Sequence, residues 1–101
     1  MARMSWVELK DQKLGSMTKA EREAYDRAYA EATLAADVGE RIRCARESAG
    51  LSQRELARRM GTSQAAIDRL ESGGVGATLT TLQRVATALD LKVVVELRAA
   101  T

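Results

Sequence analysis

Apolar residues recur every three or four positions along most of this chain, the spacing that gathers them on one face of an α-helix. The pattern predicts helices over residues 18–36, 38–49, 52–60 and 79–89, with another short helix within residues 62–74. The last apolar stretch, LKVVVELR at residues 91–98, instead alternates between apolar and polar side chains, as a half-buried β-strand does. We therefore expect a mainly α protein of five helices followed by one strand.

Capping residues mark where these helices begin. Thr18, Asp37 and Ser52 are each followed three positions later by a glutamate, and such a pair can satisfy two backbone N–H groups at a helix start. Gly50 and Gly61 are expected to end two of the helices, because glycine accepts the left-handed conformation of a helix end. The remaining two helices are expected to be capped by Thr62 or Ser63 and by Thr78 or Thr80.

The inward faces of the last four helices predict one modest core, in which each large side chain contributes about 1.5–3 kcal/mol on burial. The helix over residues 18–36 differs, since its best stripe is made of alanines and Tyr25 and forms only a shallow apolar face. The predicted core consists of Ile42, Ala45, Leu51, Leu56, Ala57, Met60, Ala66, Ile67, Leu70, Leu82, Val85, Ala86 and Leu89.

Composition excludes several classes of function. The 101 residues include no histidine and a single cysteine, Cys44, so an intrachain disulfide is impossible and no metal site is expected. We expect Cys44 to be a small buried or half-buried filler. No apolar run is long enough to span a membrane, and no signal-peptide core is present, so we predict a cytoplasmic location. The chain contains no nucleotide-binding loop and no nucleophile with a paired base, and we predict neither a cofactor nor an enzyme.

Residues 52–72, SQRELARRMGTSQAAIDRLES, predict two short helices that meet at Gly61. Ala57 is small where the first helix crosses the second, and Ile67 and Leu70 attach the second helix to the core. This is the helix-turn-helix arrangement, in which the second helix enters the DNA major groove. All eight basic residues between positions 38 and 90 are arginines, whose planar fork suits phosphate and guanine.

These residues resemble the Cro/C1-type repressor family. The chain carries Gly-Leu-Ser-Gln from Gly50, Glu-Leu-Ala from Glu55, Gly-x-Ser-x-x-x-Ile from Gly61, and Leu-Glu-x-Gly ending at Gly73. The resemblance covers about residues 38–90 and implies a lambda-repressor-like domain.

Flanking segments extend the resemblance to one subfamily. The N-terminal SWVELK, the tyrosine-containing helix and the terminal LKVVVEL make the chain similar to HigA-type antitoxins. This similarity implies a small dimeric protein that represses its own operon and neutralises a ribonuclease toxin. The alternatives are a stand-alone helix-turn-helix regulator without a toxin, and a protein-binding adaptor that does not read DNA.

The outer face of the second helix supplies the predicted base contacts. The Gln64 amide matches adenine, and the Arg69 guanidinium matches guanine. Ala65 offers a methyl-sized surface for a thymine methyl group. Asp68 can accept from cytosine N4, or it can pair with a nearby arginine.

Phosphate contacts are expected beside that helix. Gln53 starts the preceding helix, where free N–H groups favour an anion, and the family resemblance points to the same position. Arg54, Thr62 and Ser63 are further candidates, whereas the loop over residues 73–77 lacks the basic residues that related repressors place near phosphates.

The resemblance also implies a structural ion pair. In related repressors the positions of Arg46 and Glu71 hold an internal pair between the first helix and the end of the recognition helix. We expect the same pair here, as a structural element rather than a DNA contact.

A single strand leaves its edges unpaired, so we predict that the last segment pairs with its own copy about a two-fold axis. Centring this antiparallel pair on Val94 sets Lys92 opposite Glu96, whereas centring it on Val95 sets Lys92 opposite Arg98. We predict the first register, two recognition helices roughly 10 base pairs apart and a palindromic operator of double-stranded DNA. The predicted homodimer interface consists of Leu91, Val93, Val94, Val95 and Leu97.

Three parts of the chain are therefore expected. Residues 1–36 form an N-terminal extension and helix that binds a partner, residues 37–90 form the DNA-binding domain, and residues 91–101 form the dimerisation strand. Aromatic anchors suit protein interfaces, although Trp6 can instead fold back on the core. The expected toxin contacts are Trp6, Val7, Leu9, Tyr25 and Tyr29.

Overall fold

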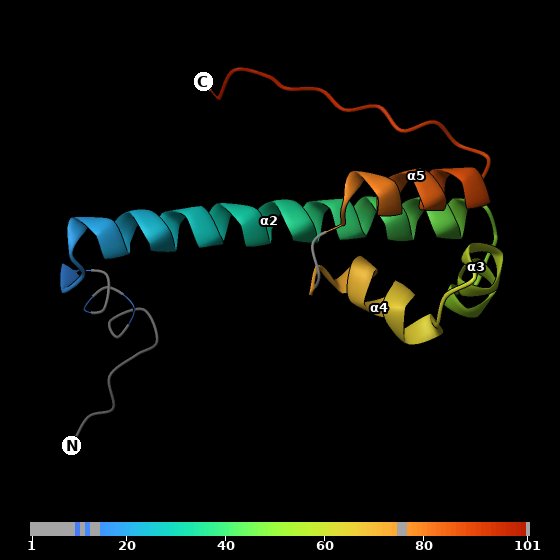
Figure 1. Cartoon of the computed structure of the whole chain (residues 1–101), viewed down its shortest axis with the longest axis horizontal. Coiled ribbons are helices and arrows are strands. Elements are labelled where there is room, and N and C mark those ends of the chain that lie inside the picture. Colours follow the sequence, from blue (N-terminus) through green and yellow to red (C-terminus); the bar gives the residue numbers. More distant parts are fainter. Residues whose placement is uncertain (1–9, 11, 13–14, 75–76, 101) are drawn as a thin grey trace. The chain divides into compact units, whose positions relative to one another are not determined.

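The computed structural model describes residues 10, 12, 15–74 and 77–100. Both ends of a helix are described for α2 (Lys19–Ser48), α3 (Gln53–Met60), α4 (Gln64–Ser72) and α5 (Leu79–Ala88), which are labelled in Figure 1. The chain forms two compact units, Met1–Glu31 and Ala32–Thr101, and α2 contributes to both.

The expectation of separate helices over residues 18–36 and 38–49 is wrong, because α2 runs without a break from Lys19 to Ser48. Asp37, expected to cap a new helix, instead accepts a hydrogen bond from Arg41 Nε at 3.2 Å, one turn further along the same helix. No glycine or proline lies between Lys19 and Val38 to end the first helix. The described residues therefore contain four such helices in place of the five expected.

In the first unit, α2 is covered with charged side chains. Lys19 and Glu23 form an exposed pair one turn apart, as do Arg22 and Asp26. Such pairs each stabilise a helix by about 0.3–0.5 kcal/mol, which supports a segment that has little apolar surface to bury.

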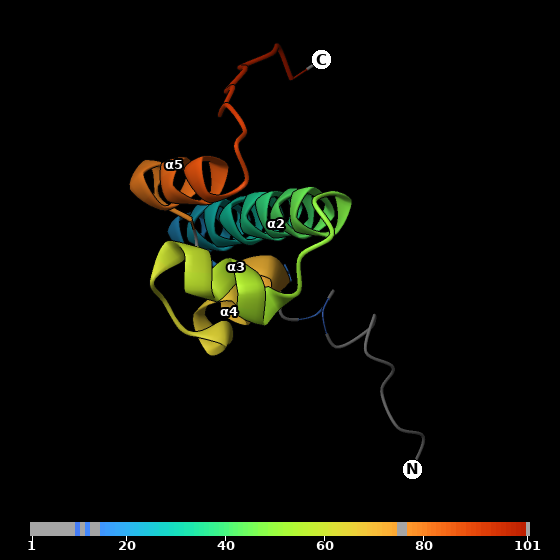
Figure 2. The ribbon, with the colours of Figure 1, turned by 90° about the vertical axis from the view of Figure 1, so that its right-hand side faces the viewer.

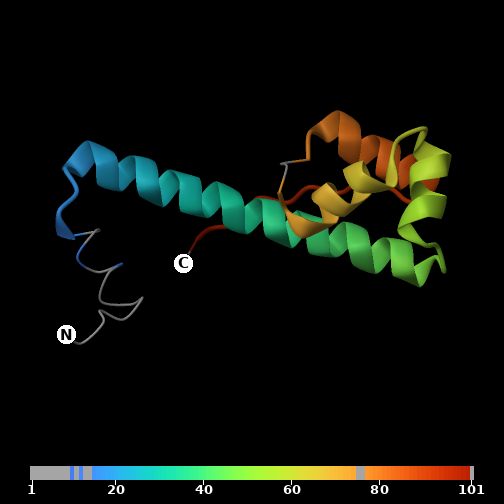
Figure 3. The ribbon, with the colours of Figure 1, turned by 90° about the horizontal axis from the view of Figure 1, so that it is seen from below.

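The second unit contains the hydrophobic core. Figure 2 shows α5 along one side of α2, with α3 and α4 along another, and Figure 3 shows α3 spanning the ends of α2 and α5. Leu56 and Ile67 are completely inaccessible to solvent. The predicted core is confirmed, with Ala45, Leu51, Ala66, Leu70 and Leu82 only partly buried. The buried core residues are Ile42, Leu56, Ala57, Met60, Ile67, Val85, Ala86 and Leu89.

Gly39 allows α2 to approach the end of α4 closely. A Cβ atom at this position would lie 2.5 Å from the carbonyl oxygen of Leu70 and 2.6 Å from that of Glu71. Gly73, which ends α4 with φ of 77°, lies equally close to α2, since its Cβ would be 2.8 Å from Ala36 Cα. Two glycines, one in α2 and one at the end of α4, therefore set the distance between these two helices.

Local capping fixes the turn between α3 and α4. Ser52 and Glu55 form a complete capping box at the start of α3, and Ser63, rather than Thr62, caps α4 by accepting from Ala66 N at 3.1 Å. Gly61 ends α3 in the left-handed conformation with φ of 66°, as expected. Thr78 caps α5 in the same way as Ser63 caps α4.

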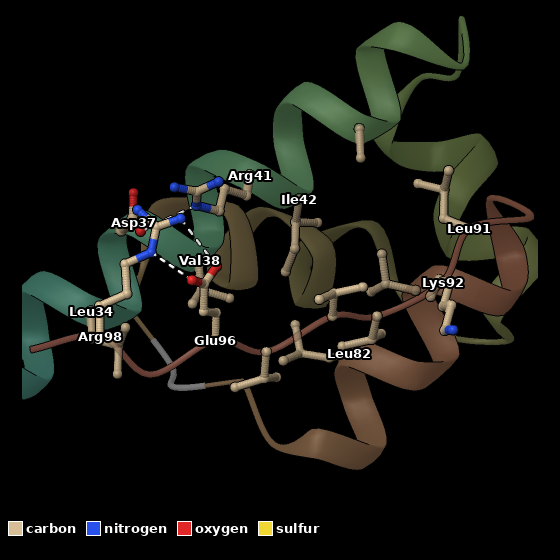
Figure 4. A pocket seen from close by; sticks show the side chains of 16 residues that line it. Leu34, Asp37, Val38, Arg41, Ile42, Leu82, Leu91, Lys92, Glu96 and Arg98 are labelled. Atoms are coloured by element: carbon tan, nitrogen blue, oxygen red, sulfur yellow. Dashed lines mark hydrogen bonds and ion pairs between the residues drawn. The ribbon is translucent and has the colours of Figure 1, made fainter.

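The segment after α5 runs back along α5 and α2 (Figure 1). Within the described range, residues 91–100 are assigned neither helix nor strand. A β-strand is defined by pairing with another strand, so the strand expected here stays a prediction about a second copy. The segment lines a groove of about 630 Å³ together with α2 and α5 (Figure 4).

Candidate nucleic-acid interface

Helix α4 has one buried face and one exposed face. Ile67 is fully buried and Leu70 is half-buried, and both attach the helix to the core. The four residues expected to contact bases are all exposed and are Gln64, Ala65, Asp68 and Arg69. The structure thus places the whole predicted set on the surface of the second helix of a helix-turn-helix.

Gln53 connects α3 to this helix. Its Nε2 donates to Asp68 Oδ1 at 3.3 Å and to Glu71 Oε1 at 3.1 Å. From the sequence, Gln53 is expected only at a phosphate, and Asp68 is expected to meet an arginine or a cytosine. In the structure the amide of Gln53 occupies that place, so it fixes where the Asp68 carboxylate lies on the exposed face.

Arg46 and Glu71 form a buried bidentate ion pair between α2 and α4. Arg46 Nε lies 2.7 Å from Glu71 Oε2, and Arg46 Nη2 lies 2.9 Å from Oε1, while the two residues are only 9% and 8% exposed. Arg46 Nη1 also donates to the carbonyl oxygen of Leu51 at 2.8 Å. The hydrogen bonds that Arg46 donates to Glu71 raise the pKa of Arg46 above its usual range despite burial, which keeps this guanidinium charged.

The other expected phosphate contacts lie at two helix starts. Arg54 is exposed on the first turn of α3, and Ser63 is exposed where α4 begins, beside the half-buried Thr62. The first backbone N–H groups of α3, those of Gln53 and Arg54, have no acceptor within the helix. Together these groups offer donors and one positive charge beside the outer face of α4.

Two arginines with no role expected from the sequence hold α3 against α5. Arg59 Nη1 donates to the carbonyl oxygen of Ala88 at 3.1 Å, and Arg84 Nη2 donates to that of Met60. Both carbonyls belong to the last residue of a helix, where cations are favoured. The partners lie 29 and 24 residues apart in sequence, so no local pattern could have identified them.

The remaining expected residues belong to other segments of the chain than α4. Cys44 is exposed, so the expectation of a buried or half-buried filler is wrong: it lies on the outer side of α2, with its Sγ 3.8 Å from Glu40 Oε1. In the first unit Tyr25 and Tyr29 stack with ring centroids 6.4 Å apart, and Lys10 Nζ lies 5.8 Å from the Tyr29 centroid. Trp6, Val7 and Leu9 lie outside the described residues.

The described residues include no group of three potential metal ligands. No helix among them is both long enough and apolar enough to cross a membrane.

A buried core around α3 and α4, a left-handed glycine at their turn and an exposed polar face on α4 define a helix-turn-helix protein. A model of a helix-turn-helix family, HTH_3, matches residues 42–95, just over half of the chain. The chain belongs to this family, which is of the Cro/C1 type and consists of DNA-binding regulators.

A relative described as an uncharacterised HTH-type transcriptional regulator, y4dL of Sinorhizobium fredii, is 42% identical over 57 residues. The match covers 56% of this chain and 29% of the relative. The chain therefore corresponds to less than a third of that protein's length.

Proposed function

We propose that this protein is a transcriptional repressor that binds a palindromic DNA operator as a homodimer. The observation that carries the proposal is the exposed face of α4, on which Gln64, Ala65, Asp68 and Arg69 are all accessible. Gln64 matches adenine and Arg69 matches guanine in the major groove. Arg54, Thr62, Ser63 and the N-terminal backbone of α3 bind the adjoining phosphates.

A gel shift with the promoter of its own gene tests this function. We expect specific binding that weakens steeply as salt rises, because each neutralised phosphate releases counterions. Removing one good bidentate contact costs about 1–3 kcal/mol of discrimination, so Gln64→Ala and Arg69→Ala should each lower specific affinity by about tenfold or more. Binding that does not depend on salt or on these two residues would leave the chain as a protein-binding adaptor.

We assign Gln53 a positioning role in base reading, because its amide is hydrogen-bonded to Asp68 and Glu71. Gln53→Ala should relax the base preference at one position of each half-site. A role confined to phosphate would instead weaken binding to all sequences equally. Selection of operators from a random library, with Asp68→Asn as the matched variant, separates these two patterns.

A second proposed activity is neutralisation of a ribonuclease toxin by residues 1–36. The first unit supports it by presenting a stacked tyrosine pair in which Tyr29 is 61% exposed, and exposed aromatic residues are frequent anchors of protein interfaces. Co-expression with the product of an adjoining open reading frame tests it. We expect a stable complex that Tyr29→Ala weakens, and an uncomplexed protein that still binds the operator would be a stand-alone regulator.

A further inference from the structure

The segment from Leu91 to Arg98 has open backbone groups and exposed apolar side chains. Leu91 N donates to the carbonyl oxygen of Ala86 at 2.7 Å, and beyond it no described N–H group up to Ala100 donates to another backbone group. Val94, Val95 and Leu97 are 79%, 67% and 95% exposed. An apolar segment with unpaired N–H and C=O groups is a template for a further strand.

The same segment lines a groove. Val93 is half-buried, and it lines the groove with Val38 and Ile42 of α2 and Leu82 and Val85 of α5 (Figure 4). Because side chains alternate along an extended chain, Leu91, Val95 and Leu97 share one face of the segment with Val93. The groove is also lined by Lys92, Val94, Glu96 and Arg98, whereas Leu97 does not line it. A strand paired beside this segment would extend its apolar face by a second row of side chains.

We propose that this groove and its tail dock the tail of a second copy, antiparallel and centred on Val94. The proposal specifies the interface of the homodimer proposed above and rests on that part of the proposed function. In this register Val93 lies opposite Val95 of the partner and Leu91 lies opposite Leu97 of the partner. The face that carries Val93 is then entirely apolar, and Leu97, the most exposed of its side chains, gains an apolar neighbour in Leu91 of the partner.

Charge selects the second copy as the occupant. On the face that carries Val94, Lys92 lies opposite Glu96 of the partner, and the two-fold axis repeats this pair on the other side of Val94. In the isolated chain Glu96 pairs with Arg98 of the same segment, with Arg98 Nε 2.8 Å from Glu96 Oε1. A register centred on Val95 would instead place Lys92 opposite Arg98 and Val94 opposite Glu96, which sets like charges against each other.

Disulfide trapping tests the register directly, in a Cys44→Ser background because Cys44 is exposed. Directly opposed residues of an antiparallel pair have Cα atoms about 4.5–5.5 Å apart, which lies within the range of a disulfide. Val94→Cys should therefore form a covalent dimer rapidly under mild oxidation. Val95→Cys meets its own copy only on the diagonal, about 7–8 Å away, and should react slowly.

Leu97→Cys controls for disulfides that form by random collision of exposed thiols. It is the most exposed of these positions, yet in the proposed register the two copies of residue 97 lie about 20 Å apart along the strand axis. Faster cross-linking of Val95→Cys or Leu97→Cys than of Val94→Cys would overturn the register.

A charge exchange tests the same interface in solution without a covalent bond. Lys92→Glu and Glu96→Lys should each raise the dimer dissociation constant at least about tenfold, because each substitution places like charges together twice across the two-fold axis. The double exchange should restore dimerisation, and this also shows that the variants fold. Glu47→Lys, an equal charge change on an α2 residue that does not line the groove, should leave the constant unchanged.

Sedimentation and operator binding are measured on the same samples, so the two proposals fail separately. A dimer that ignores the charge exchange, or a chain that stays monomeric at all concentrations, overturns the interface even if the protein binds DNA. A dimer that responds to the exchange but does not bind the operator keeps the interface and overturns the proposed function.

Discussion

At the scale of the residue, Glu71 carries more of the structure than its place on the recognition helix suggests. Its carboxylate accepts from Arg46 of α2 and from Gln53 of α3. Three helices therefore meet at one buried side chain, and removing its charge takes away the buried counter-ion of Arg46.

We expect Glu71→Gln to lower the free energy of unfolding by about 3–5 kcal/mol, because breaking a buried ion pair leaves one charge uncompensated. Urea unfolding followed by circular dichroism measures the change. Glu47→Gln is the control, since Glu47 also approaches Arg46, at 3.8 Å, but has a largely exposed side chain; it should cost at most about 1 kcal/mol. Equal effects of the two substitutions would contradict a structural role for the buried pair.

The sequence identified the residues of α4 but not all of their contacts. Ile67, Leu70 and the four exposed positions follow from helical spacing, which is a local property. The Arg46–Glu71 pair came from the family resemblance, since the two residues lie 25 positions apart. The bond from Gln53 to Asp68, 15 positions away, could not be predicted, because it depends on how α3 and α4 pack.

At the scale of the element, the close approach of α2 to α4 depends on a glycine within a helix. Alanine normally stabilises a helix interior by about 0.8–1 kcal/mol relative to glycine. At Gly39 the added Cβ would meet two backbone carbonyl oxygens of α4, which cannot rotate away as a side chain can.

We therefore expect Gly39→Ala to destabilise the protein by about 1–3 kcal/mol, the usual cost of overpacking. The thermal unfolding midpoint measures the change. Ala32→Gly, at an exposed position of the same helix, gives the propensity difference without a clash. If Gly39→Ala raised the midpoint, α2 and α4 would have to lie further apart than in the structure.

The capping box at the start of α3 predicts how the stability of the protein changes at acidic pH. Ser52, through its backbone N–H and then its side chain, holds the pKa of Glu55 below its usual value, and the nearby Arg58 and Arg59 add to this. A carboxylate whose pKa is lowered by folding stabilises the protein above its unfolded pKa and loses this contribution as pH falls through the folded pKa.

Glu55→Gln should therefore lower the unfolding midpoint at neutral pH, and the gap from the wild type should close below about pH 4. Unfolding midpoints measured from neutral to acidic pH for both proteins test this. A gap that stays constant or widens in acid would show that the charge of Glu55 does not stabilise this helix start.

The ends of the helices show where the local sequence is sufficient to predict a boundary. Ser52, Gly61 and Ser63 carry capping chemistry, and the ends of α3 and α4 lie where these residues predict them. Asp37 has the same chemistry but lies inside α2, because a capping residue starts a helix only where the preceding helix has ended. The helix α2 continues because no helix-ending residue precedes Asp37. A search for residues that start helices does not detect this absence.

At the scale of the whole molecule, the proposed dimer fixes the spacing of two recognition helices, and this spacing predicts how the operator can be altered. Two half-sites read by a two-fold dimer lie about 10–10.5 base pairs apart, centre to centre. Inserting five base pairs turns one half-site to the opposite face of the duplex. Inserting ten restores the face but adds about 34 Å of separation, which a dimer held by a short strand pair cannot span.

We expect both insertions to lower affinity at least tenfold, to the level of an isolated half-site, when labelled duplexes are titrated at one fixed salt concentration. Lys92→Glu weakens the proposed strand pair without touching α4, so this variant should bind all three duplexes with similar low affinity. The double exchange Lys92→Glu with Glu96→Lys should recover the preference for the original spacing. If the wild type bound all three duplexes equally, each helix-turn-helix would act alone, and the tail would have no part in reading the operator.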